Sequence, residues 1–330
     1  MAYSQPARTL ARRTQPTVYG PRRRGVLLGA LLALLLVATA FAAARHPHGD
    51  KGHAYPSPVR WPPEGQAALV LGDGEPTASP HEQPVPIASL AKVMTAYLTL
   101  EHYPLGAAQD GFTITVTAAE AQAVAEDAGE GQSVVAVRAG EQLTERQLLE
   151  ALLIPSGNNI GWMLASEVAG SEARFIAEMN GTASALGMDQ TNYTDPSGFD
   201  PATVSTAADQ LRVFQRAMRS PVFRQIVSMA SVTLPVAGTL TNYNPLISEG
   251  YAGKTGSDSA AEGCLAFFTH VPVGGLRQTA VGVVLGQGEG SDTRALLAAA
   301  GEAAEQLVDS IAAQHTTDVN PPANRGRKHQ

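Results

Sequence analysis

The chain contains one cysteine, Cys264, among its 330 residues. A single thiol forms no internal disulfide and cannot supply the several thiolates of a zinc or iron–sulfur site. Cys264 stands in an apolar stretch, so we expect a buried hydrophobic side chain there. His81, His102 and His270 are scattered without the spacing of metal ligands. We therefore expect no metal site and no other cofactor.

Positive charge is also scarce, and the formal net charge is -7 at pH 7. A phosphate-binding surface needs a basic field, so this balance argues against nucleic acid as a partner. The scarcity is uneven: residues 1–45 carry seven arginines and no acidic residue, whereas residues 46–312 carry 13 basic and 29 acidic residues. Basic charge thus belongs to the ends of the chain, and acidic charge belongs to its body.

Lysine is nearly absent from the body, where Lys92 and Lys254 are the only two between Trp61 and Ala312. Arginine stays protonated in proteins, whereas a buried lysine can lose its proton near neutral pH. Both lysines are therefore candidates for a chemical role that arginine cannot fill.

One long uncharged run is present, from Gly25 to Ala44. As a helix it would rise about 30 Å, the thickness of a bilayer's hydrocarbon core. Three arginines, residues 22–24, precede it directly, and such charge stays on the cytoplasmic side. This predicts a single membrane helix that leaves the body outside the cytoplasm. The alternatives are a buried core helix and a signal peptide with residues 27–37 as its apolar part, cleaved near residues 38–40 or 42–44.

Composition divides the chain into five segments. Residues 1–24 are predicted to be a disordered cytoplasmic segment, and residues 25–44 the membrane helix or signal sequence. Residues 45–60 form a linker rich in His, Pro and Gly. Residues 61–312 are predicted to be one globular domain, and residues 313–330 a disordered polar tail.

The globular part mixes strands and helices, which the apolar patterns, Gly and Pro breaks and capping residues outline. Strands are expected at residues 67–71, 112–116, 232–236, 250–255, 264–270 and 279–285. Helices are expected at residues 88–101, 145–153 after Thr144, 159–168, 171–187 from Ser171, 206–218 from Thr206 with Asp209, and 291–312 from Ser291. This order indicates an α+β fold with helices packed on an antiparallel sheet.

Three short motifs carry candidate chemistry, and each occurs once. Ser89-Leu90-Ala91-Lys92 places a hydroxyl and an amine on one face of a helix. Burial beside a second cation lowers the pKa of such a lysine, which can then act as a base. Taken alone, the motif is equally explained by a capping serine and a surface lysine.

The other two motifs are Ser156-Gly157-Asn158 and Lys254-Thr255-Gly256. The first interrupts two helices, where Ser156 can relay a proton and Asn158 can hold a substrate amide. The second lies on an expected strand, where a cation and a hydroxyl can bind a carboxylate while the glycine admits a neighbouring backbone. Alone, they could be a helix-linking turn and a strand end.

Together the motifs, in this order, resemble the active-site set of the penicillin-binding proteins and serine β-lactamases. The surrounding segments, PIASLAKVMTAYLTL, LLEALLIPSGNN and EGYAGKTG, resemble the low-molecular-mass D-alanyl-D-alanine carboxypeptidases. The resemblance covers about residues 61–312. It implies a β-lactamase/DD-peptidase-like fold, with an antiparallel sheet of about five strands packed with helices and an all-helical lobe.

The resemblance also implies a role for each matching residue. Ser89 would attack the carbonyl between the last two D-alanines of a peptidoglycan stem peptide, and Lys92 would take its proton. Ser156 would pass a proton to the departing D-alanine, and Asn158 would orient the peptide. The remaining expected substrate contacts come from Lys254 and Thr255 on the terminal carboxylate, Gly256 alongside the peptide, and Ser257, whose backbone amide with that of Ser89 forms an oxyanion hole. β-Lactam antibiotics would mimic the substrate.

The sequence departs from the family's usual residue pattern after the third motif. Asp258 stands where threonine is common, and Glu262 stands where glycine is common. A carboxylate at residue 258 would oppose an anionic substrate if it faced the cleft. Three alternatives share some or all of these motifs. A class A β-lactamase would need a Glu-x-x-x-Asn pair that is missing between the second and third motifs. A DD-endopeptidase and a penicillin-acylated sensor that does not turn over remain open.

Overall fold

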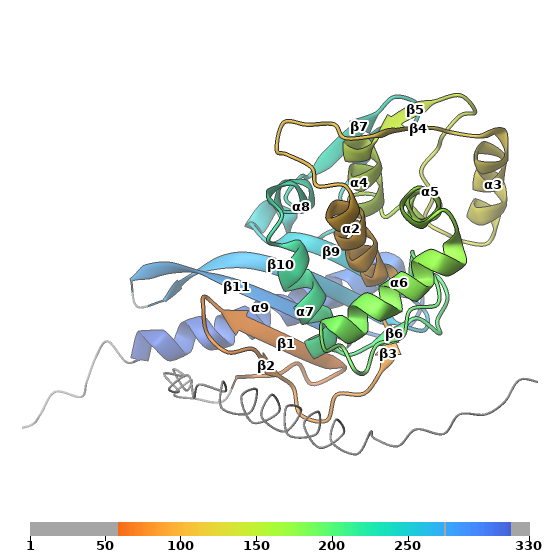
Figure 1. Ribbon diagram of the computed structural model, residues 1–330. Coiled ribbons are helices and arrows are strands. Elements are labelled where there is room, and N and C mark those ends of the chain that lie inside the picture. The colour runs from red at the N-terminus through yellow and green to blue at the C-terminus, as the bar shows by residue number, and fades with distance from the viewer. Residues whose placement is uncertain (1–58, 274, 318–330) are drawn as a thin grey trace, which may run out of the picture. The chain divides into compact units, whose positions relative to one another are not determined.

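The computed structural model describes residues 59–273 and 275–317. A five-stranded sheet lies at its base, in the order β2-β1-β11-β10-β9 (Figure 1). Each neighbouring pair is antiparallel. The strands are β1 (Gln66–Leu71), β2 (Thr77–Ala78), β9 (Ala252–Asp258), β10 (Glu262–Val273) and β11 (Leu276–Gln287). The expected antiparallel sheet of about five strands is confirmed.

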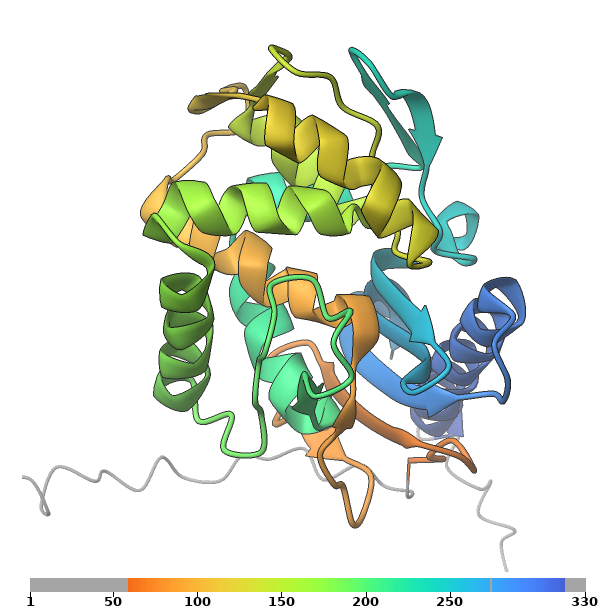
Figure 2. The same ribbon diagram turned by 90° about the vertical axis from the view of Figure 1, so that its right-hand side faces the viewer.

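Both faces of this sheet are covered. Alternate residues of β1 enter different cores: Ala68 and Val70 pack in the larger core, and Ala67, Leu69 and Leu71 in the smaller one. A strand turns successive side chains to opposite faces, which explains the division. Helix α9 (Thr293–Thr317) covers the smaller core, and α7 (Ala207–Ala217) packs on the other face (Figures 1 and 2).

The second lobe is built around α2 (Ala91–His102), which is buried along most of its length. Around it lie α3 (Ala118–Gly129), α4 (Glu145–Leu153), α5 (Asn158–Ala169), α6 (Glu172–Ala185) and α8 (Pro221–Val227). The expectation of an all-helical lobe is wrong in one respect, because two short strand pairs belong to it (Figure 1). These are β4 (Thr113–Thr115) with β5 (Gln142–Thr144), and β7 (Ser231–Leu234) with β8 (Gly238–Thr241).

Capping side chains fix most helix starts where the sequence predicts them. Thr144 forms a reciprocal capping box with Gln147, and Ser171 and Thr206 accept hydrogen bonds from backbone amides of the first turn. The last helix differs. Asp292, rather than Ser291, accepts from the amides of residues 294 and 295, because a carboxylate is a strong acceptor at this end. That helix also runs past residue 312 to Thr317.

The segment expected to cross a membrane, residues 25–44, lies outside the described residues, as do the flanking residues 1–24 and 45–58. In the described ranges, none of the helices combines the length and apolar character needed to span a bilayer.

Candidate active site

Ser89 lies in a 3-10 turn, η1 (Ala88–Leu90), that leads directly into α2. Lys92 follows in the first turn of α2, three residues later and on the same face. Its Nζ lies 2.7 Å from Oγ of Ser89. Ser89 is half-buried, whereas Lys92 is fully buried. The motif thus places a reachable hydroxyl against an amine that is withdrawn from water.

The backbone just before Ser89 is held in an uncommon conformation. Ala88 has φ 43, in the left-handed region that residues other than glycine seldom occupy. Gly198 packs against it so closely that an added Cβ would stand 1.8 Å from the Ala88 carbonyl oxygen. A side chain at residue 198 would therefore displace the turn that presents Ser89.

The second motif connects α4 to α5. Asn158 begins α5, and its Oδ1 accepts a hydrogen bond from Nζ of Lys92 at 2.7 Å. Ser156 has φ 64 and is buried, and its Oγ accepts a hydrogen bond from Nζ of Lys254 at 3.0 Å. The break between the helices therefore aims one polar side chain at each of the two buried lysines.

The third motif lies on β9, the edge strand of the sheet. Lys254 also donates to the carbonyl oxygen of Thr255 at 2.7 Å. A Cβ added at Gly256 would stand 3.1 Å from the backbone nitrogen of Ser89 and 3.0 Å from the Ile87 oxygen. This glycine lets β9 run alongside η1. Thr255 is buried and Ser257 half-buried on the same strand, and within the described ranges neither side chain hydrogen-bonds to the other motif residues.

Segments 67 and 98 residues apart in sequence therefore meet in one cluster. A family model described as D-alanyl-D-alanine carboxypeptidase matches residues 77–287, which include every motif residue named above. The chain belongs to the D-alanyl-D-alanine carboxypeptidase family.

Relatives in this family carry two kinds of name. D-alanyl-D-alanine carboxypeptidase DacB2 of Mycobacterium tuberculosis is 34% identical over 185 residues, covering 53% of this chain and 59% of that protein. The carboxypeptidase DacC of Escherichia coli is 33% identical, covering 58% and 46%. A D-alanyl-D-alanine endopeptidase of Pseudomonas aeruginosa is 30% identical, covering 62% of each. The matches span less than two thirds of each relative.

Two solved structures share the fold of this chain. A Streptomyces DD-transpeptidase superposes with a TM-score of 0.65 at 24% identity, covering 77% of this chain and all of that one. A penicillin-binding protein homologue of Mycobacterium tuberculosis superposes with a TM-score of 0.63 at 28% identity, covering 81% and 96%. The fold of these structures therefore accounts for the sheet, for α7 and α9 on its faces, and for the lobe around α2.

Burial dominates the electrostatics of this cluster. Burial lowers the pKa of Lys92 well below its ordinary value, the charge of Lys254 lowers it further, and the carboxylate of Asp195 opposes both effects. Burial also lowers the pKa of Lys254, to about 7. Two ammonium groups in one dry cluster repel each other, which favours a state in which one of the two lysines is neutral.

The hydrogen bonds of Lys92 determine where its lone pair points. Two of its three partners, Oδ1 of Asn158 and the Ser197 carbonyl oxygen at 2.8 Å, are oxygens that only accept. A neutral amine has two N–H groups, and both are used on these oxygens. The third position of the nitrogen faces Oγ of Ser89: a protonated Lys92 donates a hydrogen bond there, and a neutral Lys92 turns its lone pair to that hydroxyl. The arrangement suits proton transfer from that hydroxyl to Lys92.

Two contributors to the cluster were missed in the sequence analysis. Gln132 accepts a hydrogen bond from Nδ2 of Asn158 at 3.0 Å, and Ser197 acts through its carbonyl oxygen. Any residue supplies a carbonyl, so Ser197 leaves no side-chain signal. Gln132 lies in a loop whose approach to α5 depends on tertiary packing.

Asp258 and Glu262, the two residues that depart from the family's usual pattern, lie at the β9–β10 turn. Oδ1 of Asp258 accepts from the amides of Ala260 and Ala261, each at 2.7 Å. The carboxylate therefore closes the turn. Glu262 pairs with Asp258 across the ladder at φ 56. Cys264 is buried on the next strand, and burial raises the pKa of its thiol to about 12, so the prediction of a buried hydrophobic side chain is confirmed.

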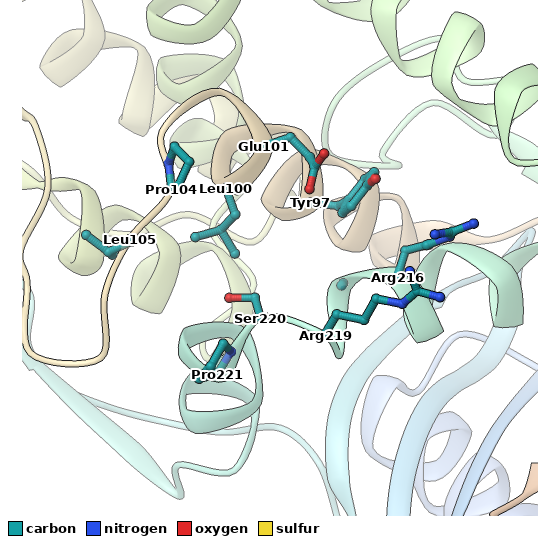
Figure 3. A pocket seen from close by; sticks show the side chains of 10 residues that line it. Tyr97, Leu100, Glu101, Pro104, Leu105, Arg216, Arg219, Ser220 and Pro221 are labelled. Atoms are coloured by element: carbon teal, nitrogen blue, oxygen red, sulfur yellow. The ribbon is translucent and has the colours of Figure 1, made fainter. Parts of the chain in front are cut away.

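A hollow of about 460 Å³ lies at the C-terminal end of α2 (Figure 3). Tyr97 and Glu101 line it from α2, and Arg216 and Arg219 line it from the end of α7 and the following turn. Cations at the C-terminal end of a helix complement its dipole. None of the motif residues lines this hollow, so it is separate from the cluster.

Proposed function

We propose that this protein is a serine-type D-alanyl-D-alanine carboxypeptidase that removes the terminal D-alanine from peptidoglycan stem peptides. One observation carries the proposal: a half-buried serine hydroxyl lies 2.7 Å from a buried lysine amine that also donates to the Asn158 amide oxygen and the Ser197 carbonyl oxygen. Such a pair can make the serine oxygen nucleophilic without a histidine or a metal.

In the acylation step, Oγ of Ser89 attacks the carbonyl carbon of the last peptide bond and its proton passes to Nζ of Lys92. The backbone amides of Ser89 and Ser257 stabilise the oxyanion that forms. The C–N bond then breaks. The proton held on Lys92 reaches the departing D-alanine nitrogen through Ser156, which leaves an ester on Ser89. Water hydrolyses that ester and restores the serine.

Substrate recognition follows from the buried charge on β9. Lys254 and Thr255 bind the terminal carboxylate, and Asn158 orients the peptide amide. Gly256 leaves room for the peptide to lie along β9. A β-lactam presents a carboxylate and an acyl bond in a similar arrangement. We therefore expect it to acylate Ser89.

The test is incubation of the protein with a diacyl-Lys-D-Ala-D-Ala peptide, with free D-alanine as the readout. The wild-type chain should release D-alanine and bind a fluorescent penicillin covalently, and the matched Ser89→Ala variant should do neither. D-Alanine release at the wild-type rate by Ser89→Ala would overturn the assignment of the nucleophile.

The same assay separates the two open alternatives. Relatives named endopeptidase lie within the same family, so cross-linked peptidoglycan dimers should be tested beside the short peptide. Cleavage of the dimer without D-alanine release would favour the endopeptidase. Acylation by penicillin without turnover of either substrate would favour a sensor.

The location of the protein is a separate proposal. The uncharged run of residues 25–44, with three arginines before it, supports a single-pass anchor in the cell membrane with the catalytic domain outside the cytoplasm. Secretion after signal cleavage is the alternative, and either route brings the enzyme to its substrate.

A further inference from the structure

One buried carboxylate beside the cluster has no assigned role. Asp195 is 4% exposed and forms no ion pair within 4 Å in the described ranges. Its carboxylate instead accepts hydrogen bonds from the loop that follows it. Oδ1 accepts from the amide and hydroxyl of Ser197 and the amide of Gly198, each at 2.6 Å. Oδ2 accepts from the amide of Asp200 at 3.0 Å and the hydroxyl of Thr203 at 3.2 Å.

The loop that follows Asp195 makes two contacts next to Ser89. The Ser197 carbonyl accepts from Lys92, and Gly198 packs against the Ala88 carbonyl just before Ser89. The Pro196 carbonyl accepts from Oγ1 of Thr95, one turn further along α2, at 2.6 Å. The carboxylate of Asp195 therefore fixes the peptide groups that hold Lys92 in place.

Charge counting leads to the same residue. The charged groups that act on Lys92 are Lys254 on β9 and Asp195, and its other partners, Ser89, Asn158 and the Ser197 carbonyl, are neutral. Two buried lysines and one buried carboxylate are electrically balanced when one lysine is neutral. A general base works best when its pKa lies near the operating pH, so a base whose proton affinity falls too far accepts the serine proton poorly.

We propose that Asp195 is a positioning residue: it orients the Lys92 amine toward Ser89 through the Ser197 carbonyl, and its carboxylate is the buried negative charge of the cluster. The inference rests on the proposed function, because Ser89 acylation is the step it serves.

Asp195→Asn is the deciding variant. The amide keeps an oxygen for Ser197 and Gly198, and its NH2 group can donate to the Thr203 hydroxyl, so the loop loses the charge and one backbone acceptor. The measurement is the rate of acylation by a fluorescent penicillin between pH 5 and 10. We expect the acidic limb to move to lower pH by about one unit, because an opposite charge no longer raises the pKa of Lys92. We expect the plateau rate to fall about tenfold, because Lys92 is then a weaker base.

Two controls separate this role from loop scaffolding. Asp209→Asn neutralises another buried, hydrogen-bonded carboxylate, which receives the amide of Gln190 and the hydroxyl of Thr191. Thr203→Val removes a donor to Asp195 and leaves the charge. Both should leave the acidic limb where it is in the wild-type chain. An unmoved limb in Asp195→Asn, or an equal shift in Asp209→Asn, would overturn the inference.

A second measurement uses the unmodified side chain. In protein labelled at the aspartate carboxyl carbons, one resonance should show a step at the pH of the kinetic limb, and the step should vanish in Lys92→Met. This arm decides the matter if Asp195→Asn does not fold, and no such step contradicts the inference. If the wild-type chain is never acylated, the proposed function fails, while the resonance still reports whether Asp195 senses Lys92.

Discussion

At the scale of single residues, Lys92 and Lys254 show how one side chain serves two tasks. Both are buried in the same cluster, yet Lys92 faces the Ser89 hydroxyl and Lys254 faces Ser156. In the proposed mechanism, the first task requires a lysine that gives up its proton, and the second requires one that is charged when it binds the carboxylate. Arginine can replace the second function but not the first.

The same substitution at both positions therefore predicts unequal losses. Lys92→Arg should lower the rate of penicillin acylation by about 10³-fold, since general-base catalysis is worth about 10²–10⁴. Lys254→Arg should lower it by about tenfold, because the charge stays but the guanidinium is larger than the space. Acylation rates of both variants check this, with circular dichroism to establish folding. Equal losses, or the reverse order, would show that another group takes the serine proton.

At the scale of secondary-structure elements, those marked by a local sequence signal were predicted well, and those that depend on tertiary packing were not. Helices with a capping side chain at the expected place, such as α4 after Thr144, could be predicted because the cap is a local interaction. Helices α3 and α8 were missed. Helix α3 has no buried residue, so it lacks an apolar period, although the pair Thr117 and Glu120 is a capping box that marks its start.

The same distinction holds for the site. The three motifs could be read from the sequence because their chemistry resides in side chains. The 3-10 turn at Ser89, the left-handed Ala88 and the Ser197 carbonyl could not, because each depends on a backbone that other segments press into position. Gly198 and Gly256 allow other segments to pack closely against this backbone. The need for glycine at these positions becomes clear only when the neighbouring segment is known.

The contact between β9 and η1 leads to a prediction about Gly256. Gly256→Ala would place a methyl group 3.1 Å from the Ser89 nitrogen and 3.0 Å from the Ile87 oxygen, both backbone atoms. We expect the acylation rate to fall about tenfold or more, because small displacements of a nucleophile are costly, while the protein remains folded. Gly181→Ala on α6 is the matched control, since nothing lies within 4 Å of its added methyl. Undiminished acylation in Gly256→Ala would show that β9 can move away from η1.

A second element-scale prediction concerns Glu82, in the loop before β3 (Val85–Pro86). Oε2 accepts from the amide of Ala208 at the start of α7, whereas Oε1 is buried and has no partner in the described ranges. Burial raises the pKa of Glu82 from 4.5 to about 7, and Asp209 adds to the effect. Between these pH values the folded chain binds the proton more tightly than the unfolded chain. The contribution of this group to stability is therefore full below pH 4.5 and is lost by about pH 7.

Glu82→Gln should remove that pH dependence. The free energy of unfolding of the variant minus that of the wild-type chain should be larger at pH 8 than at pH 5. Urea unfolding at the two pH values measures the difference. Glu75→Gln, at an exposed carboxylate in the preceding turn, is the control and should show no such change. A difference between Glu82→Gln and wild type that is independent of pH would mean that Glu82 remains ionised in the fold.

At the scale of the whole molecule, the site lies where two kinds of structure meet. The edge strand β9 comes from the sheet, and η1, α2 and α5 come from the helical lobe. The chain leaves the strands of the sheet after β2 and returns to them only at β9, which explains why the third motif follows the second by 98 residues. The order of the motifs could be read from the sequence. Which motif lies on the sheet and which lie in the helical lobe could not be predicted in full.

The N-terminal segment gives the last prediction, which concerns where the molecule works. If the uncharged run of residues 25–44 is an uncleaved anchor, the full chain should stay in the membrane pellet after alkaline carbonate extraction, and its intact mass should include residue 25. Replacing that run with a Gly/Ser linker of equal length is the control. It should leave the protein soluble and unexported, because neither anchor nor signal remains. If the intact mass shows that the mature wild-type chain begins after residue 40 or 44, the segment is a cleaved signal peptide. If residues 61–312 are protected from a protease added outside the cytoplasmic membrane, both the anchor and the signal peptide are contradicted.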